Sequence, residues 1–321
     1  MTLDLRSAAA NGLLDAPAAS FRLAGADLDG GSAVVIDTGS GVYRLADLLP
    51  DAVAAPAHVH ELLADWTRWQ PVLGAVAGLA PATGAAPVVP ERWGLPVSPS
   101  KLVCIGTNYH DHLREMGTPH TPQYPYAFLK PVSTGLVASG TEVRLPPGPA
   151  MVDWEAELAI VIGRPLHEEL GASVLDAIAG YTIINDLSAR DWIRGKPEVG
   201  IDWVMMKAYD GFSPIGPWFT PADRVPDPQA LGIRCWVNDE LRQDSNTSEM
   251  VFGVQAILEH LAGIMTLLPG DVVATGTPAG VGFGRDPQQF LHAGDTVAVE
   301  IDRLGRLETR IAPTTTEGPT T

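Results

Sequence analysis

Apolar residues in the last two thirds of the chain gather in short runs, each ending at Gly, Asn, Asp or Pro, which is typical of β-strands. The predicted strands are residues 101–106, 127–130, 158–163, 181–186, 233–239, 271–276 and 296–302. Between them, residues 249–265 repeat Met, Phe, Val, Ile and Leu at helical intervals. Helices therefore alternate with strands too rarely for a doubly wound sheet. The pattern predicts mixed β structure with short helices, an α+β fold.

The first 95 residues have a different pattern of apolar and polar positions. Residues 20–49 predict short strands separated by Gly-rich turns, and residues 57–80 have the apolar spacing of a helix. Residues 82–101 are rich in Pro, Gly and Ala and predict a linker. We therefore expect a small β-rich N-terminal domain over 1–95, a catalytic domain over 96–312 and a disordered Thr-rich tail over 313–321.

Composition narrows the possible partners. The 321 residues include 21 Lys and Arg against 38 Asp and Glu, a formal net charge of −17, which argues against binding nucleic acid or anionic membranes. No apolar run is long enough to span a bilayer, and the first residues lack the pattern of a signal peptide. We expect a cytoplasmic protein. Cys104 and Cys235 lie in apolar, strand-like segments and are expected to be buried free thiols.

Two carboxylates stand at the head of the apolar run 158–163. Glu155 and Glu157 point to the same face of a strand, where like charges beside apolar residues are costly unless a cation lies between them. Asp186 ends the next apolar run. Three carboxylates suit Mg²⁺, Mn²⁺ or Ca²⁺ better than Zn²⁺. The alternative is that these acids are solvated strand ends or pair with Arg164, Arg190 or Arg194.

Five segments in a fixed order make the chain, over about residues 100–312, resemble the fumarylacetoacetate hydrolase superfamily. The segments are VDWEAELAIVIGR, GYTIINDLSARDW, KAYDGFSPIGPWF, VNDELRQ and LPGDVVATGTPAGVG, followed by AGDTVAVEIDRLGRLETRI. The resemblance implies a β-roll or barrel-like catalytic domain, a small N-terminal domain used in subunit packing, and a homodimer. It also implies Mg²⁺ or Mn²⁺ as cofactor, held by Glu155, Glu157 and Asp186.

A helical pair is the candidate base. His112 and Glu115 are three residues apart and share a face on a helix, where a carboxylate can orient an imidazole for general-base work. Taken alone, the pair could equally be an ordinary exposed one. The surrounding NYHDHLRE resembles the family segment N-Y-x-x-H-x-x-E, which implies that the dyad activates water. His110 and His120 receive no role.

Cationic and hydroxyl side chains complete the predicted site. The resemblance places Lys207 beside the metal, where it supports an enolate or oxyanion, although a surface lysine is also compatible with the sequence. Thr277 matches a position that contacts substrate in relatives. The further candidates for substrate contact are Tyr109, Lys130 and Arg190. Arg190 could equally brace Asp186 or Asp191.

These parts imply a metal-dependent hydrolase that cleaves a C–C bond in a β-diketo acid such as an acylpyruvate or fumarylpyruvate. Water activated by the His–Glu dyad would attack, and the metal would stabilise the departing enolate. The alternatives are a decarboxylase, isomerase or hydratase of a 2-oxo acid, and a family member that binds a 2-oxo acid without turnover. Ile193 stands where relatives commonly carry Gln, and Arg194 follows it, so the substrate preference stays open.

Overall fold

The computed structural model describes residues 19–51, 53–118, 120–194, 198 and 200–314. Three features considered from the sequence lie outside this description. They are the start of the chain, most of the Thr-rich tail and the side chain of Arg194. Among the described residues, none of the helices combines the length and the apolar composition that crossing a bilayer requires.

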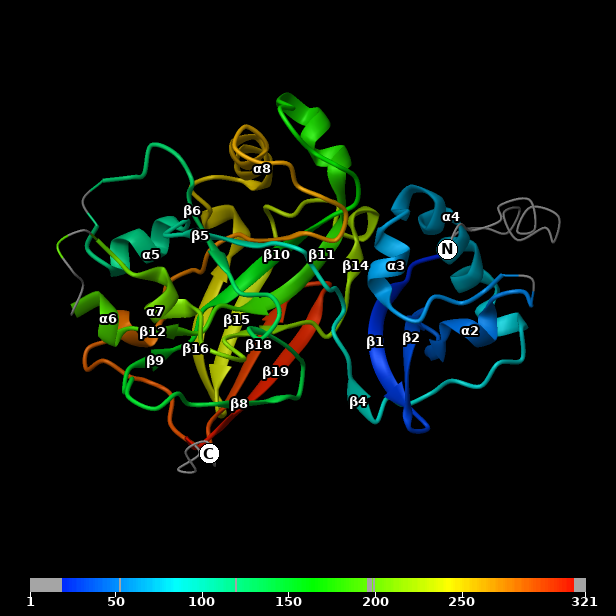
Figure 1. Ribbon diagram of the computed structural model, residues 1–321, viewed down its shortest axis with the longest axis horizontal. Helices are drawn as coiled ribbons and strands as arrows, with labels where there is room; N and C mark the ends of the chain where they lie inside the picture. The colour runs from blue at the N-terminus through cyan, green and yellow to red at the C-terminus, as the bar shows by residue number, and fades with distance from the viewer. Residues whose placement is uncertain (1–18, 52, 119, 195–197, 199, 315–321) are drawn as a thin grey trace, which may run out of the picture.

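The N-terminal part is an antiparallel four-stranded sheet with helices packed on one face (Figure 1). Its strand order is β3 (Val42–Arg44), β2 (Gly31–Asp37), β1 (Arg22–Leu28) and β4 (Arg92–Trp93). Its helices are α2 (Leu45–Leu48), α3 (Val59–Leu63), α4 (Trp66–Leu79) and the 3-10 turn η2 (Ala80–Ala82). Alternate residues of β1 face opposite sides, so Leu23 packs with the helices while Ala24 and Ala26 pack against Trp218.

Two larger sheets form the rest of the molecule and curl into a half-barrel (Figure 1). The first has the order β6 (Tyr126–Lys130), β5 (Leu102–Gly106), β17 (Val272–Ala274), β10 (Ala156–Ile162), β11 (Ile178–Asn185), β13 (Ser213–Ile215) and β7 (Leu136–Ala138), with β14 (Thr220–Pro221) paired to β11. The second has the order β16 (Glu240–Asn246), β15 (Gly232–Val237), β18 (Thr296–Ile301), β19 (Gly305–Ala312) and β8 (Glu142–Arg144). A short pair joins β9 (Val152–Asp153) to β12 (Ser188–Ala189).

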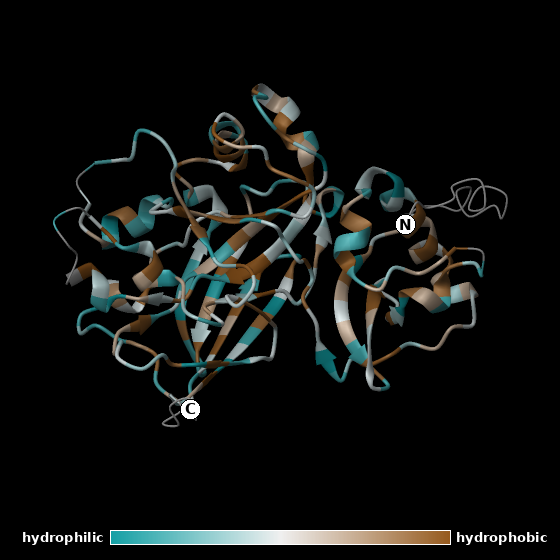
Figure 2. Cartoon of the chain, in the orientation of Figure 1, coloured by the Kyte–Doolittle hydropathy of each residue, from teal (hydrophilic) through white to brown (hydrophobic). Residues whose placement is uncertain are grey.

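The two sheets share one apolar core, in which β10 and β11 are buried along their whole length. Figure 2 shows apolar residues concentrated along these central strands. The remaining helices and 3-10 turns are short and lie at the rim. They are α5 (His110–Glu115), η3 (Gly171–Ala177), α6 (Asp191–Arg194), α7 (Trp203–Lys207), η4 (Ala222–Arg224), η5 (Thr247–Glu249), α8 (Val254–Ala262) and η6 (Gly282–Gly284). The predicted α+β fold is confirmed.

Two local predictions need correction. The helix expected over 249–265 forms only as α8, because the backbone at Met250 and Val251 pairs instead with residues 108–109; the amide of Val251 donates to the carbonyl of Asn108 at 2.8 Å. The linker expected over 82–101 contains β4, which pairs with β1. All seven predicted strands are present with shifted ends, and Cys104 and Cys235 are buried and free, as predicted.

The N-terminal part is continuous with the half-barrel. Leu23 of β1 and Phe219, just before β14, exchange two backbone hydrogen bonds of 2.9 and 2.7 Å. The ring of Trp66 from α4 meets that of Phe219 edge-on, with centroids 5.0 Å apart. One apolar cluster runs through this junction from the N-terminal helices to β5 and β17.

Candidate metal centre

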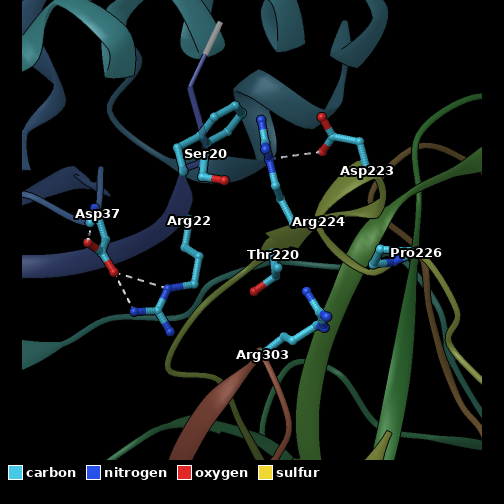
Figure 3. A pocket seen from close by; sticks show the side chains of 10 residues that line it. Ser20, Arg22, Asp37, Thr220, Asp223, Arg224, Pro226 and Arg303 are labelled. Atoms are coloured by element: carbon cyan, nitrogen blue, oxygen red, sulfur yellow. Dashed lines mark hydrogen bonds and ion pairs between the residues drawn. The ribbon is translucent and has the colours of Figure 1, made fainter. Parts of the chain in front are cut away.

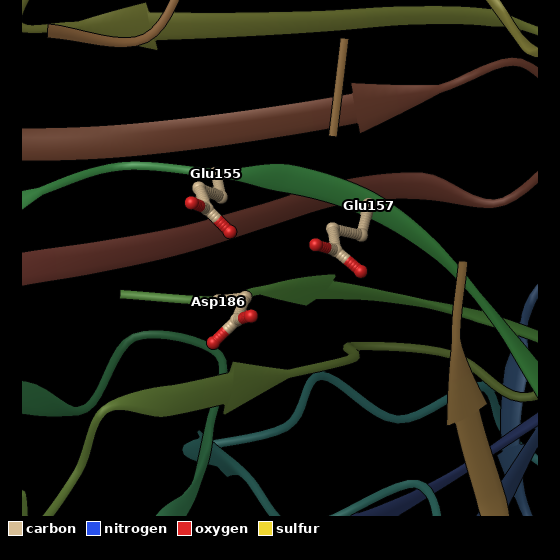
Figure 4. Close-up of side chains that lie close together, drawn as sticks. All are labelled: Glu155, Glu157 and Asp186. Carbon is tan, nitrogen blue, oxygen red and sulfur yellow. The ribbon is translucent and has the colours of Figure 1, made fainter. Parts of the chain in front are cut away.

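Strand pairing brings the three predicted carboxylates together. Strands β10 and β11 are antiparallel with Ala156 opposite Asn185, so the residue before β10 meets the residue after β11. The amide of Asp186 accordingly donates to the carbonyl of Glu155 at 2.9 Å. Glu155, Glu157 and Asp186 are all buried, and each offers a carboxylate oxygen within 4.8 Å of the others (Figure 4). They are therefore not solvated strand ends.

Cations already surround two of the three carboxylates. Nζ of Lys207 lies 2.7 Å from Oε2 of Glu155 and 2.5 Å from Oδ2 of Asp186. Nζ of Lys130 lies 2.5 Å from the other oxygen of Asp186, and Nη2 of Arg190 lies 2.6 Å from Oε1 of Glu155. Burial works against the charge of Glu155, but Lys207 and Arg190 outweigh it and lower the pKa of this carboxyl to about 2.

Glu157 is held differently. Its side chain accepts a hydrogen bond from the amide of Gly276 at 2.8 Å, and within the described residues no lysine or arginine pairs with it. Burial, reinforced by the charges of Asp186 and Glu155, raises the pKa of Glu157 well above its usual range. A buried carboxylate without a cationic partner is costly. An all-carboxylate set with one such member fits a divalent cation that prefers oxygen ligands, such as Mg²⁺ or Mn²⁺.

Asp153, a buried carboxylate with no role predicted from the sequence, orients a cationic side chain of the site. Asp153 is fully buried and accepts hydrogen bonds from the amides of Gly282 and Phe283 at 2.7 and 3.0 Å. Nε of Arg190 lies 2.9 Å from the same carboxylate, so Asp153 aims the guanidinium at Glu155. Of the pairings left open for Arg190, the structure shows the one with Glu155 and neither the one with Asp186 nor the one with Asp191. A direct contact between Arg190 and a substrate stays a prediction.

The predicted dyad forms on helix α5. Nδ1 of His112 lies 2.9 Å from Oε2 of Glu115, and the His112 side chain is only 9% exposed, so the pair is not an ordinary surface one. Because a carboxylate only accepts, Nδ1 carries the hydrogen, and in the neutral imidazole Nε2 then keeps its lone pair. The other oxygen of Glu115 accepts from the amide of Gly280 at 2.8 Å. The dyad is thus fixed to the loop that follows β17.

That loop also holds Thr277. The Thr277 hydroxyl donates to the carbonyl of Ala156 at 2.9 Å and accepts from Nε2 of Gln243 at 2.8 Å. Gln243 is completely buried, and its oxygen accepts from the amide of Ala156 at 3.0 Å. These bonds position Thr277 between β10 and β16. The hydrophobic pattern gave no role to Gln243, because its strand reads as polar, although the family segment VNDELRQ ends with it.

Two predicted substrate-binding residues are deeply placed. Lys130 donates to Asp186 and, at 2.6 Å, to the carbonyl of Phe212, with its side chain 1% exposed, so it positions a ligand of the candidate metal. Tyr109 is fully buried, and its hydroxyl lacks a partner of good hydrogen-bond geometry within the described residues. Burial, with the charge of Glu157 nearby, raises the pKa of Tyr109 well above its usual value. Whether either residue touches substrate stays a prediction.

Comparison with known proteins identifies the family. The family model described as fumarylacetoacetate (FAA) hydrolase C-terminal matches residues 101–312. The chain belongs to this family. The fold resemblance extends further: the fumarylacetoacetate hydrolase of the psychrophile Exiguobacterium antarcticum superposes over 92% of this chain and 100% of its own, with a TM-score of 0.75 and 28% sequence identity. The expected fumarylacetoacetate-hydrolase type of fold is confirmed.

Two other relatives of the family bear on chemistry. The mitochondrial oxaloacetate tautomerase of Xenopus laevis is 44% identical over 210 residues, which are 65% of this chain and 65% of that protein. The match thus spans about two thirds of each chain. The maleylpyruvate hydrolase of Sphingobium sp. SYK-6, solved with a manganese(II) ion and pyruvate, is 30% identical and covers 92% of this chain and 100% of its own, with a TM-score of 0.71. The chain is thus a fumarylacetoacetate hydrolase family protein with a buried acidic triad suited to a metal.

Proposed function

We propose that the chain is a Mg²⁺- or Mn²⁺-dependent enzyme acting on a small 2-oxo acid, and that keto–enol tautomerisation of oxaloacetate is its leading reaction. The observation that carries this proposal is the buried triad of Glu155, Glu157 and Asp186, in which Glu157 lacks a cationic partner among the described residues. The 44% identity to an oxaloacetate tautomerase supports this choice of reaction.

The metal would be held by Glu155, Glu157 and Asp186 and, when bound, would act as a Lewis acid on the oxygens of the 2-oxo acid. Lys207 adds positive charge beside this position, where negative charge develops on the substrate oxygen. Arg190, aimed by Asp153, keeps Glu155 ionised and in place.

His112 is the group that moves the proton. Glu115 engages Nδ1, which leaves Nε2 of the neutral imidazole free to take a proton from the carbon next to the 2-oxo group of the substrate. The oxygen of that group takes a proton from water to complete the enol, and His112 returns its own proton to water. The loop after β17 contacts both groups, since the amide of Gly276 donates to Glu157 of the triad and the amide of Gly280 donates to Glu115 of the dyad. The same proton transfers run in reverse convert enol to keto form.

A second candidate is hydrolysis of a β-diketo acid, the reaction predicted first from the sequence. The oriented His112–Glu115 dyad favours it, because such a pair can take a proton from a water molecule that attacks the carbonyl remote from the carboxylate. The 30% identity to a maleylpyruvate hydrolase also supports this reaction. Decarboxylation is less well supported, since it needs no general base and would leave the dyad without a role.

The deciding experiment is a paired assay on metal-stripped protein with Mg²⁺ or Mn²⁺ added back. It follows the interconversion of enol and keto oxaloacetate and the cleavage of acetylpyruvate. Because divalent ions act on 2-oxo acids by themselves, the reference is the Glu157→Gln variant with the same ion. Metal-dependent interconversion that is lost in His112→Ala supports the tautomerase, and cleavage lost in that variant supports the hydrolase. If the unmodified chain acts on both acids no faster than Glu157→Gln does, the proposal is contradicted.

A further inference from the structure

A pocket with several charged side chains in its wall lies where the N-terminal sheet meets the half-barrel (Figure 3). It has a volume of 340 Å³. Its walls come from the segment entering β1, from residues 220–226 around β14 and η4, and from the turn between β18 and β19. No residue of the candidate metal centre lines it. The three arginines in the wall are Arg22, Arg224 and Arg303.

The existing contacts of these arginines leave donors unused. Arg22 directs Nε and Nη2 to Asp37, while its Nη1 lies near Gly305, two residues beyond Arg303. Arg224 donates through Nη2 to the carbonyl of Ala19 at 3.0 Å. A guanidinium carries five N–H donors, so each of these side chains retains N–H groups for another acceptor.

Arg303 is the least committed of the three. Within the described part of the chain, its exposed side chain forms no ion pair or hydrogen bond. Asp37 and Asp223 also line the pocket, so its five charged side chains sum to one positive charge. In a protein of formal net charge −17, this is a local reversal of sign.

A buried hydroxyl provides an independent observation. Thr220 is only 1% exposed, and its Oγ1 has no hydrogen-bond partner within the described residues. In Figure 3 this oxygen points into the space between Arg22 and Arg303. Buried polar groups are rarely left unpaired, because an unmade hydrogen bond costs the full desolvation of the group. The hydroxyl is therefore positioned to donate to a ligand in the pocket.

We propose that this pocket binds a small oxyanion of the phosphate or carboxylate type. The groups facing it include guanidinium N–H groups and the hydroxyls of Ser20 and Thr220. The Asp37 carboxylate is engaged by Arg22 and the amide of Gly39, and Oδ1 of Asp223 lies 3.5 Å from Nε of Arg224. Such a donor-rich lining requires a ligand that only accepts, and charge-assisted bonds from arginine favour planar or tetrahedral oxyanions. The site is separate from the proposed function and does not depend on it.

The test is isothermal titration calorimetry of the full chain with inorganic phosphate and, separately, with malonate. We expect measurable binding of at least one anion. Arg303→Gln removes an exposed charge and is expected to weaken binding about tenfold. Thr220→Val keeps the shape of the side chain, removes the hydroxyl and is expected to weaken binding several-fold.

Arg306→Gln is the matched control, because Arg306 lies in the neighbouring strand β19, pairs with Glu300 and Glu308, and does not line the pocket. Binding unchanged in Arg306→Gln and weakened in Arg303→Gln supports the site. Stronger binding of phosphate than of malonate then assigns a phosphate ligand, and the reverse order assigns a carboxylate. Absence of binding by the unmodified chain, or equal binding by it and Arg303→Gln, overturns the proposal. Because Arg303 is exposed, this variant stays informative even if Thr220→Val does not fold.

Discussion

Lys207 bridges Glu155 and Asp186, with Nζ 2.7 Å from one carboxylate and 2.5 Å from the other. Glu155 and Asp186 thus share the ammonium group of Lys207, whereas within the described residues no lysine or arginine pairs with Glu157. The charge that a bound metal must neutralise is therefore concentrated on Glu157, although all three side chains offer it an oxygen.

This difference predicts how metal affects stability. We expect Mn²⁺ to raise the melting temperature of the unmodified chain, because a ligand at about 100 times its Kd stabilises the folded state by about 2.7 kcal/mol. Glu157→Gln should show little of this shift. Without metal, Glu157→Gln should melt no lower than the unmodified chain, since the amide removes a buried carboxylate whose pKa is raised by burial. Calorimetric melting with and without Mn²⁺ checks both points. A full shift in Glu157→Gln would contradict the assignment.

Lys130 is predicted to be a positioning residue. Lys130→Met keeps most of the apolar stem but leaves Asp186 and the carbonyl of Phe212 without their donor. Removing one member of a buried ion pair costs about 3–5 kcal/mol. Denaturant unfolding measures this loss. Arg164→Met, which breaks the half-exposed pair with Glu169, is the control and should cost about 1 kcal/mol or less. Similar losses in both variants would show that burial of the Lys130 pair is unimportant.

The dyad is predicted to act on turnover and not on metal binding. His112→Ala should lower kcat by about 10²- to 10⁴-fold, the usual contribution of a positioned base. Its affinity for Mn²⁺ should stay close to that of the unmodified chain, because His112 bonds to Glu115 and not to the triad. His260→Ala, which alters a histidine on α8 stacked against Tyr124, is the matched control and should keep normal kcat. Retention of full kcat in His112→Ala would exclude the base.

Gly284 lies against the side chain of Glu115 and allows a steric test of the dyad. A Cβ added at Gly284 would lie 2.4 Å from Cδ of Glu115 and 2.5 Å from its Cγ. Gly284→Ala should therefore displace Glu115, destabilise the fold by about 1–3 kcal/mol and reduce turnover. Gly263→Ala, whose added Cβ would meet its nearest atom at 3.6 Å, is the control and should leave both unchanged. Measuring kcat and unfolding together shows whether the two effects coincide. Normal turnover in Gly284→Ala would separate Glu115 from the reaction.

The central strands and the triad were predictable for the same physical reason. Short apolar runs rich in β-branched residues and ended by polar ones favour buried central strands, and polar residues are placed where such runs end. Once β10 and β11 pair as antiparallel neighbours, Glu155, Glu157 and Asp186 must converge. The i, i+3 spacing likewise predicted the contact between His112 and Glu115.

The residues missed are polar ones buried by tertiary contacts. Strand β16 reads as polar, yet Gln243 within it is completely buried because it satisfies the backbone of Ala156 and the carbonyl of Pro278. Asp153 precedes the acidic pair without any periodic signal, and its partners come from a loop about 130 positions later. Such long-range pairing leaves no trace in local hydrophobic pattern. Both residues lie in segments that carry the family resemblance, but the contacts that bury them are seen only in the fold.

Because of the paired backbone bonds between Leu23 and Phe219 and the apolar cluster around them, we expect the N-terminal sheet and the half-barrel to unfold as a single cooperative unit. Cutting the chain after residue 95 would leave the amide and carbonyl of Phe219 unpaired and uncover the ring that Trp66 now contacts. The apolar cluster shared by both parts would face water. The metal centre and the N-terminal sheet are thus expected to unfold in one transition. A substitution that destabilises the junction should therefore also disrupt the carboxylate triad, because it unfolds the whole chain.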